Sequence, residues 1–226
     1  MPVDPYAICP CGSGKKLKFC CSDLVGEIEK IHRMIEGEQP RAALRHVEQT
    51  LASHPNRASL LDLKATLELS LGEIDAARET VAKFVATNAD SPTAFACQAL
   101  LLAELRESRP AIDSLQKALA MVDREMPLRV YEALGAVGGA CLESGHILAA
   151  QAHLWLHAAL APKEDSRARE VLAALNHYSG LPVILRDQLR FRPWPQDAPW
   201  RGEAEKASQL ADHGKWQQAV VAIDRL

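Results

Sequence analysis

A small residue recurs along this chain at a nearly constant interval, and this interval is the strongest constraint on its fold. Ala43, Ala77 and Ala111 lie inside successive helix-like segments and are 34 residues apart. The series continues at Ala150 and Ala219, after intervals of 39 and 69 residues. A period of about 20–50 residues is typical of proteins whose units bury their apolar faces only against neighbouring units. We therefore expect a stack of similar helical units.

The period of 34 residues, with two helices in each unit, resembles that of the tetratricopeptide repeat (TPR) family. The small residue early in each TPR unit falls on Ala65, Ala99, Gly138 and Ala207, and the turn glycine falls on Gly72, Gly145 and Gly214. The third unit has Arg106 at the turn, and we assign the extra residues of the fourth unit to the loop Met121–Pro127. The resemblance implies an all-α, TPR-like helical-hairpin solenoid whose first helices line a concave, peptide-binding face.

Four of the six cysteines lie within thirteen residues near the start of the chain, in the pattern C-x-C-x8-C-C. They are Cys9, Cys11, Cys20 and Cys21. Four thiolates in one short loop are the donor set of a closed, tetrahedral zinc site. We predict one structural Zn²⁺ ion held by these four thiolates. Disulfide pairing is the weaker alternative, since it requires an oxidising compartment and strains a bond between adjacent cysteines.

This segment resembles the SEC-C motif, a short zinc-binding module found at the end of the SecA translocase and in many other bacterial proteins. The motif reads approximately C-x-C-G-S-G-x-K-x-K-x-C-[HC], and the chain matches it at Cys9, Cys11, Gly12, Ser13, Gly14, Lys16, Lys18, Cys20 and Cys21. The resemblance implies that the segment contacts a partner, for which we expect Lys15, Lys16, Leu17 and Lys18 to be the contact residues. We also expect it to cap the open end of the solenoid.

The chain divides into four parts on these patterns. Residues 1–22 form the zinc knuckle and residues 23–162 form four TPR-like helix pairs. Residues 163–200 combine a degenerate fifth repeat, whose second helix we expect at 181–189, with an irregular segment rich in proline and tryptophan. Residues 201–226 begin a further repeat that stops inside its second helix. We expect the chain to be the N-terminal portion of a longer protein.

Composition and motifs argue against several classes of function. The net charge is −3, which gives no electrostatic basis for bulk binding to nucleic acid or membranes. The chain opens without a secretory signal and has no apolar stretch of transmembrane length, so the reduced thiols indicate a cytoplasmic protein. No nucleophile, phosphate-loop or dinucleotide motif is present, which indicates a protein that is not an enzyme. The glycine-rich stretch 135–140 indicates close helix packing.

The concave face suggests what kind of partner the chain binds. The residues expected on this face include Asp62, Thr66, Glu104, Glu132 and Glu143, and none of the positions expected there is lysine or arginine. We therefore expect a non-enzymatic scaffold that binds a basic or apolar protein segment, with no membrane or small-molecule ligand. Two alternatives stay open: an adaptor for the ribosome or nucleic acid that uses the knuckle lysines, and a scaffold for an enzyme beyond residue 226.

Overall fold

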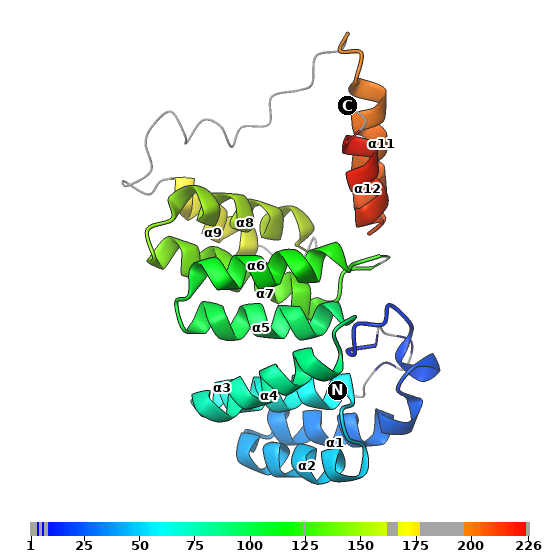
Figure 1. Ribbon diagram of the computed structural model, residues 1–226, viewed down its shortest axis with the longest axis vertical. Coiled ribbons are helices and arrows are strands. Elements are labelled where there is room, and N and C mark those ends of the chain that lie inside the picture. The colour runs from blue at the N-terminus through cyan, green and yellow to red at the C-terminus, as the bar shows by residue number, and fades with distance from the viewer. Residues whose placement is uncertain are drawn as a thin grey trace.

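The computed structural model describes residues 4, 6, 9–123, 125–161, 167–176 and 197–224, and these residues form a helical stack (Figure 1). Two short 3₁₀ helices come first, η1 (Leu17–Phe19) and η2 (Ser22–Leu24). The α-helices are α1 (Val25–Glu36), α2 (Pro40–Ser53), α3 (Ala58–Ser70), α4 (Ile74–Thr87), α5 (Pro92–Glu104), α6 (Ser108–Ala120), α7 (Leu128–Glu143), α8 (Ile147–Leu160), α9 (Arg167–Asn176), α11 (Arg201–Asp212) and α12 (Trp216–Ile223).

Consecutive helices pack as hairpins, and the hairpins stack on one another. Helices α1 and α2, α3 and α4, α5 and α6, and α7 and α8 form the pairs, and the second helix of each pair also packs on the first helix of the next. Helix α5 contacts both α3 and α7, so the first helices form one layer and the second helices form the other. The predicted all-α helical-hairpin solenoid with an N-terminal cysteine cluster is confirmed.

The turn inside each hairpin requires the same left-handed backbone conformation. Gly72, Gly145 and Gly214 adopt it with φ of 73°, 75° and 71°, and Glu38 and Arg106 adopt it with φ of 56° and 59°. Glycine reaches this region at little cost, whereas other L-residues are strained there. Arg106 has the same backbone conformation as these glycines. The repeat register therefore holds through the third unit, although its turn lacks glycine.

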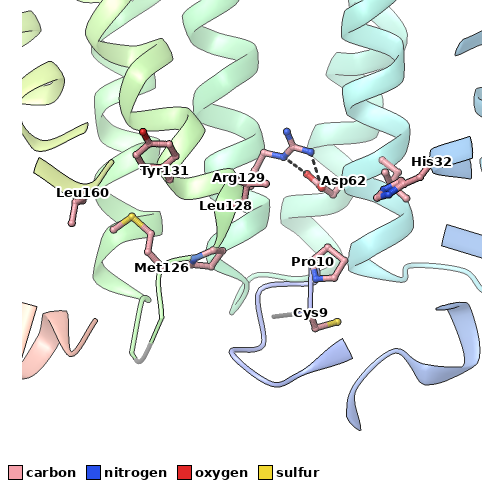
Figure 2. Close-up of a pocket in the computed structure, with 11 residues that line it drawn as sticks. Cys9, Pro10, His32, Asp62, Met126, Leu128, Arg129, Tyr131 and Leu160 are labelled. Carbon is pink, nitrogen blue, oxygen red and sulfur yellow. Dashed lines mark hydrogen bonds and ion pairs between the residues drawn. The ribbon is translucent and has the colours of Figure 1, made fainter. Parts of the chain in front are cut away.

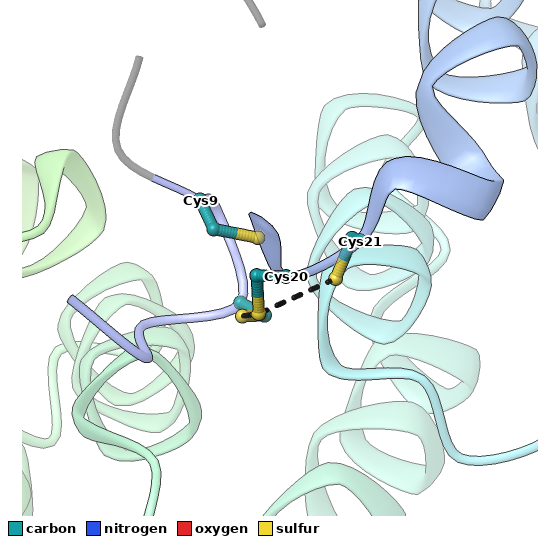
Figure 3. A group of neighbouring side chains, drawn as sticks. Cys9, Cys20 and Cys21 are labelled. Carbon is teal, nitrogen blue, oxygen red and sulfur yellow. Dashed lines mark hydrogen bonds between the residues drawn. The ribbon is translucent and has the colours of Figure 1, made fainter. Parts of the chain in front are cut away.

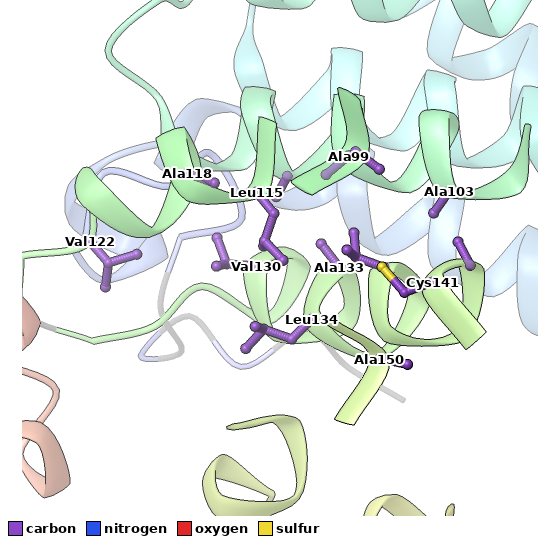
Figure 4. Packing of buried hydrophobic residues seen from close by; sticks show 14 residues of the cluster. Ala99, Ala103, Leu115, Ala118, Val122, Val130, Ala133, Leu134, Cys141 and Ala150 are labelled. Carbon is purple, nitrogen blue, oxygen red and sulfur yellow. The ribbon is translucent and has the colours of Figure 1, made fainter. Parts of the chain in front are cut away.

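Small residues allow the two layers to approach closely, which is why the alanine series runs through the core. Ala99, Ala111, Ala133 and Ala150 are fully buried in one cluster that spans α5 to α8 (Figure 4). Cys141 belongs to this cluster, and Cys97 is buried in the neighbouring cluster between α3 and α5. Burial raises the pKa of both thiols, so they remain protonated, apolar packing residues.

The glycine-rich stretch packs against α8 as expected. A Cβ placed on Gly138 would lie 2.7 Å from Cγ of Leu154, whereas one placed on Gly139 would meet nothing within 4 Å. Gly138 therefore marks the close approach of α7 and α8, and Gly139 serves as a matched position in the same helix.

Exchanging these two glycines for alanine is expected to have opposite effects. Gly138→Ala should destabilise the protein by about 1–2 kcal/mol, because overpacking outweighs the gain in helix propensity. Gly139→Ala should stabilise it by about 0.5–1 kcal/mol, since only the propensity changes. Urea denaturation followed by circular dichroism measures both values. Shifts of equal sign and size would contradict the close approach.

The fourth unit differs from its prediction in where the extra residues lie. Helix α7 has 16 residues, whereas α3 and α5 have 13 each. The insertion therefore lengthens the start of α7 as well as the loop before it. Assigning all of it to Met121–Pro127 was wrong, and the added turn carries Arg129 onto the concave face.

The C-terminal part of the chain forms a further hairpin of α11 and α12. Its link to the stack includes a hydrogen bond of 2.7 Å from Nε2 of Gln217 to the carbonyl oxygen of Ala120, at the end of α6. Helix α9 packs on α8, and the expected helix at 181–189 lies outside the described residues. None of the helices formed by the described residues has the length and apolarity needed to cross a membrane.

Candidate metal centre and concave groove

The four N-terminal cysteines converge on one point (Figure 3). The sulfur atoms of Cys9, Cys11, Cys20 and Cys21 all lie within 4.8 Å of one another, and Cys9 and Cys21 are buried. Cys11 and Cys20 have their sulfurs 3.4 Å apart, and Cys20 and Cys21 have theirs 4.0 Å apart. A tetrahedral metal with bonds of about 2.3 Å to sulfur places its ligands about 3.8 Å apart. The donor set and its spacing therefore fit a metal ion.

The local backbone explains why these side chains meet. The N–H of Cys9 donates to the carbonyl oxygen of Lys15 at 2.8 Å, which closes the loop between the first two cysteines and η1. The N–H groups of Cys20 and Cys21 both donate to the carbonyl oxygen of Leu17, at 3.1 and 3.0 Å. This tight turn aims two adjacent cysteines at one centre, an arrangement that a sheet or a longer helix would not give.

Hydrogen bonds within the cluster favour the thiolate form of Cys21 and the protonated form of Cys9 and Cys11. Hydrogen bonds with Cys11 and Cys9, followed by those with Arg57 and Ser59, hold the pKa of the Cys21 thiol well below its ordinary value. A hydrogen bond with Cys21 raises the pKa of Cys11 to about 11, so Cys11 keeps the proton of the pair and Cys21 is the thiolate. The guanidinium of Arg57 also binds Asp23 through two hydrogen bonds of 2.7 and 2.8 Å. A cation is thus fixed beside a site that would carry net negative charge with a divalent metal.

Residues 9–24 comprise the cysteine cluster with η1 and η2, and from here on we call this segment the knuckle. It packs along the edge of the stack and reaches its third hairpin. Leu17 and Leu24 share a buried cluster with residues of α1, α2 and α3. The hydroxyl of Ser91 donates to the carbonyl oxygen of Cys11 at 3.0 Å, across 80 positions of sequence. In Figure 1 this blue segment lies beside the start of α5, along the side of the stack. The expectation that it caps the open end of the solenoid is therefore corrected.

The knuckle approaches the start of α5 closely at Gly12. This residue has φ of +81°, and a Cβ on it would lie 2.5 Å from Oγ1 of Thr93. Gly14 also has positive φ, at +67°, but a Cβ there would meet nothing within 4 Å. The two glycines share the backbone requirement and differ in the contact with α5.

Replacing Gly12 is therefore expected to undock the knuckle. Gly14→Ala should cost about 1–2 kcal/mol of stability for its backbone strain, and Gly12→Ala should cost about 1–3 kcal/mol more for the clash. Thermal unfolding and limited proteolysis within residues 9–24 measure the difference. Adding Thr93→Ala to Gly12→Ala removes the hydroxyl at 2.5 Å and should recover most of the extra cost, because Oγ of Ser91 and Cβ of residue 93 remain 3.1 and 3.2 Å from the new Cβ. Equal effects of the two single variants would contradict the docked position.

Most of the expected groove residues do line one cavity. Thr66, Glu104, Glu132 and Glu143 come from α3, α5 and α7 and surround a space of about 640 Å³, which we call the acidic pocket. Glu104 forms no ion pair with any described residue, and Glu143 pairs with Arg106 at 3.2 Å, with side chains 58% and 75% exposed. Exposed pairs of this kind contribute about 0–1 kcal/mol, so these carboxylates remain available to a cationic ligand.

Asp62 differs from the other acidic groove residues because it is buried as well as paired with an arginine. Its side chain is 6% exposed, and it accepts hydrogen bonds from Nε and Nη2 of Arg129 at 2.7 and 2.9 Å. Nη1 of Arg129 donates to Glu132 at 2.6 Å. Burial lowers the pKa of Arg129, but the charge and hydrogen bonds of Asp62 outweigh that effect and keep it above its ordinary value. The expectation of a groove without lysine or arginine was wrong at this point.

The expected contact residues of the knuckle also separate into two kinds. Lys15 and Lys16 are exposed, and Nζ of Lys18 lies 3.6 Å from the centre of the Tyr6 ring. Leu17 is only 1% exposed, which removes it from any contact surface. Its apolar character reflects packing against the stack, and its position in η1 is what turns the chain toward Cys20 and Cys21.

Comparison with known proteins adds no relative. No protein-family model, no curated protein and no solved structure matches this chain. The resemblances to the SEC-C motif and to the TPR family therefore stand on the residues quoted for them.

Proposed function

We propose that this chain is a non-enzymatic scaffold, braced by a structural zinc ion, that binds an extended segment of a partner protein along its concave groove. The observation that carries the proposal is the acidic pocket of about 640 Å³, which is lined by three glutamates, Glu104, Glu132 and Glu143, and by two arginines, Arg106 and Arg129. The arginines pair with Glu143 and Glu132, which leaves Glu104 as the carboxylate of the pocket without an ion pair to any described residue. Carboxylates gathered in a groove favour a basic partner by electrostatic complementarity. The TPR-like register supports it, since proteins of that family bind peptides on the face made by first helices.

The zinc module has a structural role in this proposal. Its four thiolates leave no open coordination position, as is typical of structural rather than catalytic sites. The SEC-C resemblance supports zinc over other thiophilic metals, and reduced thiols suit a cytoplasmic location. The knuckle lysines are few, and strong binding to phosphates needs more cations, so we favour a protein partner over nucleic acid.

Peptide binding to the full chain tests the function. Fluorescein-labelled peptides with alternating basic and apolar residues should bind, whereas acidic peptides of equal length should not. Glu104→Lys should weaken binding of the basic peptides about tenfold, because it reverses a charge in the pocket. Glu79→Lys makes the same change at an exposed site on α4, outside the acidic pocket, and should leave the affinity within about twofold.

Salt and the remaining variants complete this test. Raising the salt concentration should weaken binding of the basic peptides, since exposed charges are screened. Glu132→Lys should act in the same direction as Glu104→Lys. The proposal fails if no peptide binds, if acidic peptides bind equally well, or if Glu104→Lys and Glu79→Lys have the same effect.

A further inference from the structure

A second cavity adjoins the acidic pocket, and the knuckle forms part of its wall (Figure 2). This space of about 580 Å³, which we call the junction pocket, lies within the range of about 300–1,000 Å³ typical of ligand sites. Its walls come from distant parts of the chain: Cys9 and Pro10 of the knuckle, Asp62 of α3, Met126 of the loop before α7, and Leu128 and Arg129 of α7.

The lining of the junction pocket is mainly apolar. Met126, Leu128 and Leu160 supply aliphatic surface, and Leu128 is 70% exposed although it is a large hydrophobic side chain. The ring of Tyr131 is stacked on His157, with centroids 4.4 Å apart, which fixes one wall. The two charged lining residues, Asp62 and Arg129, form an ion pair with each other. This chemistry selects an apolar group and gives no advantage to an ion.

Arg129 joins the two pockets, because its side chain lines both of them. One pocket is acidic and the other is apolar, and both open on the face made by the first helices. An extended segment that carries a basic residue and a bulky apolar residue a few positions apart complements the pair in charge and in polarity.

The position of Cys9 and Pro10 depends on the folded knuckle. The hydrogen bond of Cys9 to Lys15 and that of Ser91 to Cys11 hold Cys9 and Pro10 in the wall of the junction pocket. The same cysteine is thus a candidate metal ligand and a part of the cavity wall. A knuckle that loses its fold removes one side of the pocket.

We propose that the junction pocket takes a bulky apolar side chain of the partner segment whose basic residue enters the acidic pocket, and that the metal-organised knuckle is one wall of this binding site. This inference rests on the proposed function and adds two things to it. It names the chemistry of the ligand as one apolar anchor beside one basic residue. It also makes affinity for the apolar anchor depend on the knuckle.

A peptide array and two matched variants test the inference. The array carries twelve-residue peptides in a glycine–serine background, each with one Arg and one Leu, Phe or Trp separated by one to six residues, together with versions that lack either residue. The full chain should bind peptides with both residues at a preferred separation. Leu128→Gln should weaken binding of these peptides about fivefold and leave peptides without the apolar residue unchanged.

The control variant is Leu148→Gln. Leu148 is 61% exposed near the start of α8 and lies outside both pockets, so its replacement should change no affinity. Removal of metal with a chelator, and Cys20→Ser, should reproduce the loss seen with Leu128→Gln for peptides that carry the apolar residue. Intrinsic fluorescence and circular dichroism measured alongside establish that helices α3 to α8 remain folded.

The results separate this inference from the function on which it rests. Binding that depends on Arg and Glu104 but not on the apolar residue, Leu128 or the metal overturns the inference and leaves the proposed function standing. Absence of binding to every peptide overturns both. Self-association that Leu128→Gln abolishes assigns the pocket to a second copy of the chain and also overturns the inference.

Discussion

Replacing Arg129 with leucine is expected to destabilise the protein by about 3–5 kcal/mol, because it leaves the buried carboxylate of Asp62 without a counter-ion. Asp62 is 4% exposed as a residue, and Arg129 supplies it with two hydrogen bonds of 2.7 and 2.9 Å. For a domain of this size the loss corresponds to a fall of roughly 6–20 °C in the thermal midpoint. Thermal unfolding followed by circular dichroism measures it.

Two controls distinguish the buried charge from the loss of a side chain. The double variant Arg129→Leu/Asp62→Leu should recover most of the stability, since apolar pairs often replace buried ion pairs without net cost. Arg201→Leu removes a pair to Glu205 of the same 2.7 Å length, but those side chains are 38% and 49% exposed. It should cost less than about 1 kcal/mol. Similar losses for Arg129→Leu and Arg201→Leu would refute the argument.

The sequence predicted the repeat architecture because the alanine series reports a packing requirement. Each alanine lies where two helices approach closely, and a larger side chain at such a site would separate them. The turn residues show how a prediction can hold despite a departure in sequence. Arg106 keeps the left-handed φ of its glycine counterparts, because the helices on either side of the turn fix the direction of the chain.

The groove could be predicted only in part, since an insertion is ambiguous between loop and helix. The five extra residues of the fourth unit show no helical pattern of apolar residues. We therefore assigned them to a loop, and this assignment missed the added turn at the start of α7. The available signal was the position of Arg129, three residues before Glu132 and hence on the same helical face. Its pairing with Asp62 joins α7 to α3 across 67 positions of sequence, and no local pattern predicts such a contact.

The knuckle illustrates a similar limit. The cysteine pattern predicted which side chains would converge, because ligand number and spacing are local properties. It could not predict where the knuckle docks. The contacts of Gly12 with Thr93 and of Cys11 with Ser91 join segments about 80 residues apart. Leu17 was expected to contact a partner but is buried. The knuckle packs on the apolar surface that the helical stack leaves exposed. That surface is formed by residues from several helices, so it cannot be recognised in the sequence of the knuckle.

The cysteine cluster is expected to bind one zinc ion per chain, and Cys11→Ser should abolish this binding and release the knuckle from the stack. Leu17 and Leu24 are 1% and 0% exposed, and burying such side chains contributes about 1.5–3 kcal/mol each. Their exposure should therefore cost about 3–6 kcal/mol. Inductively coupled plasma mass spectrometry measures the zinc, and thermal unfolding together with proteolysis within residues 9–24 measures the release.

Cys97→Ala is the matched control for this experiment, because it removes a cysteine that is buried between α3 and α5 and lies outside the cluster. It should keep one zinc per chain and leave residues 9–24 protected from protease. A chelator added to the unmodified protein should reproduce the Cys11→Ser result, since binding of a structural metal and folding of its ligands are coupled. Four thiolates also suit iron–sulfur clusters, so purified protein that contains iron and sulfide would contradict zinc while keeping the ligands. Protein without metal under reducing conditions, with residues 9–24 still protected, would show instead that packing of Leu17 and Leu24 alone holds the knuckle.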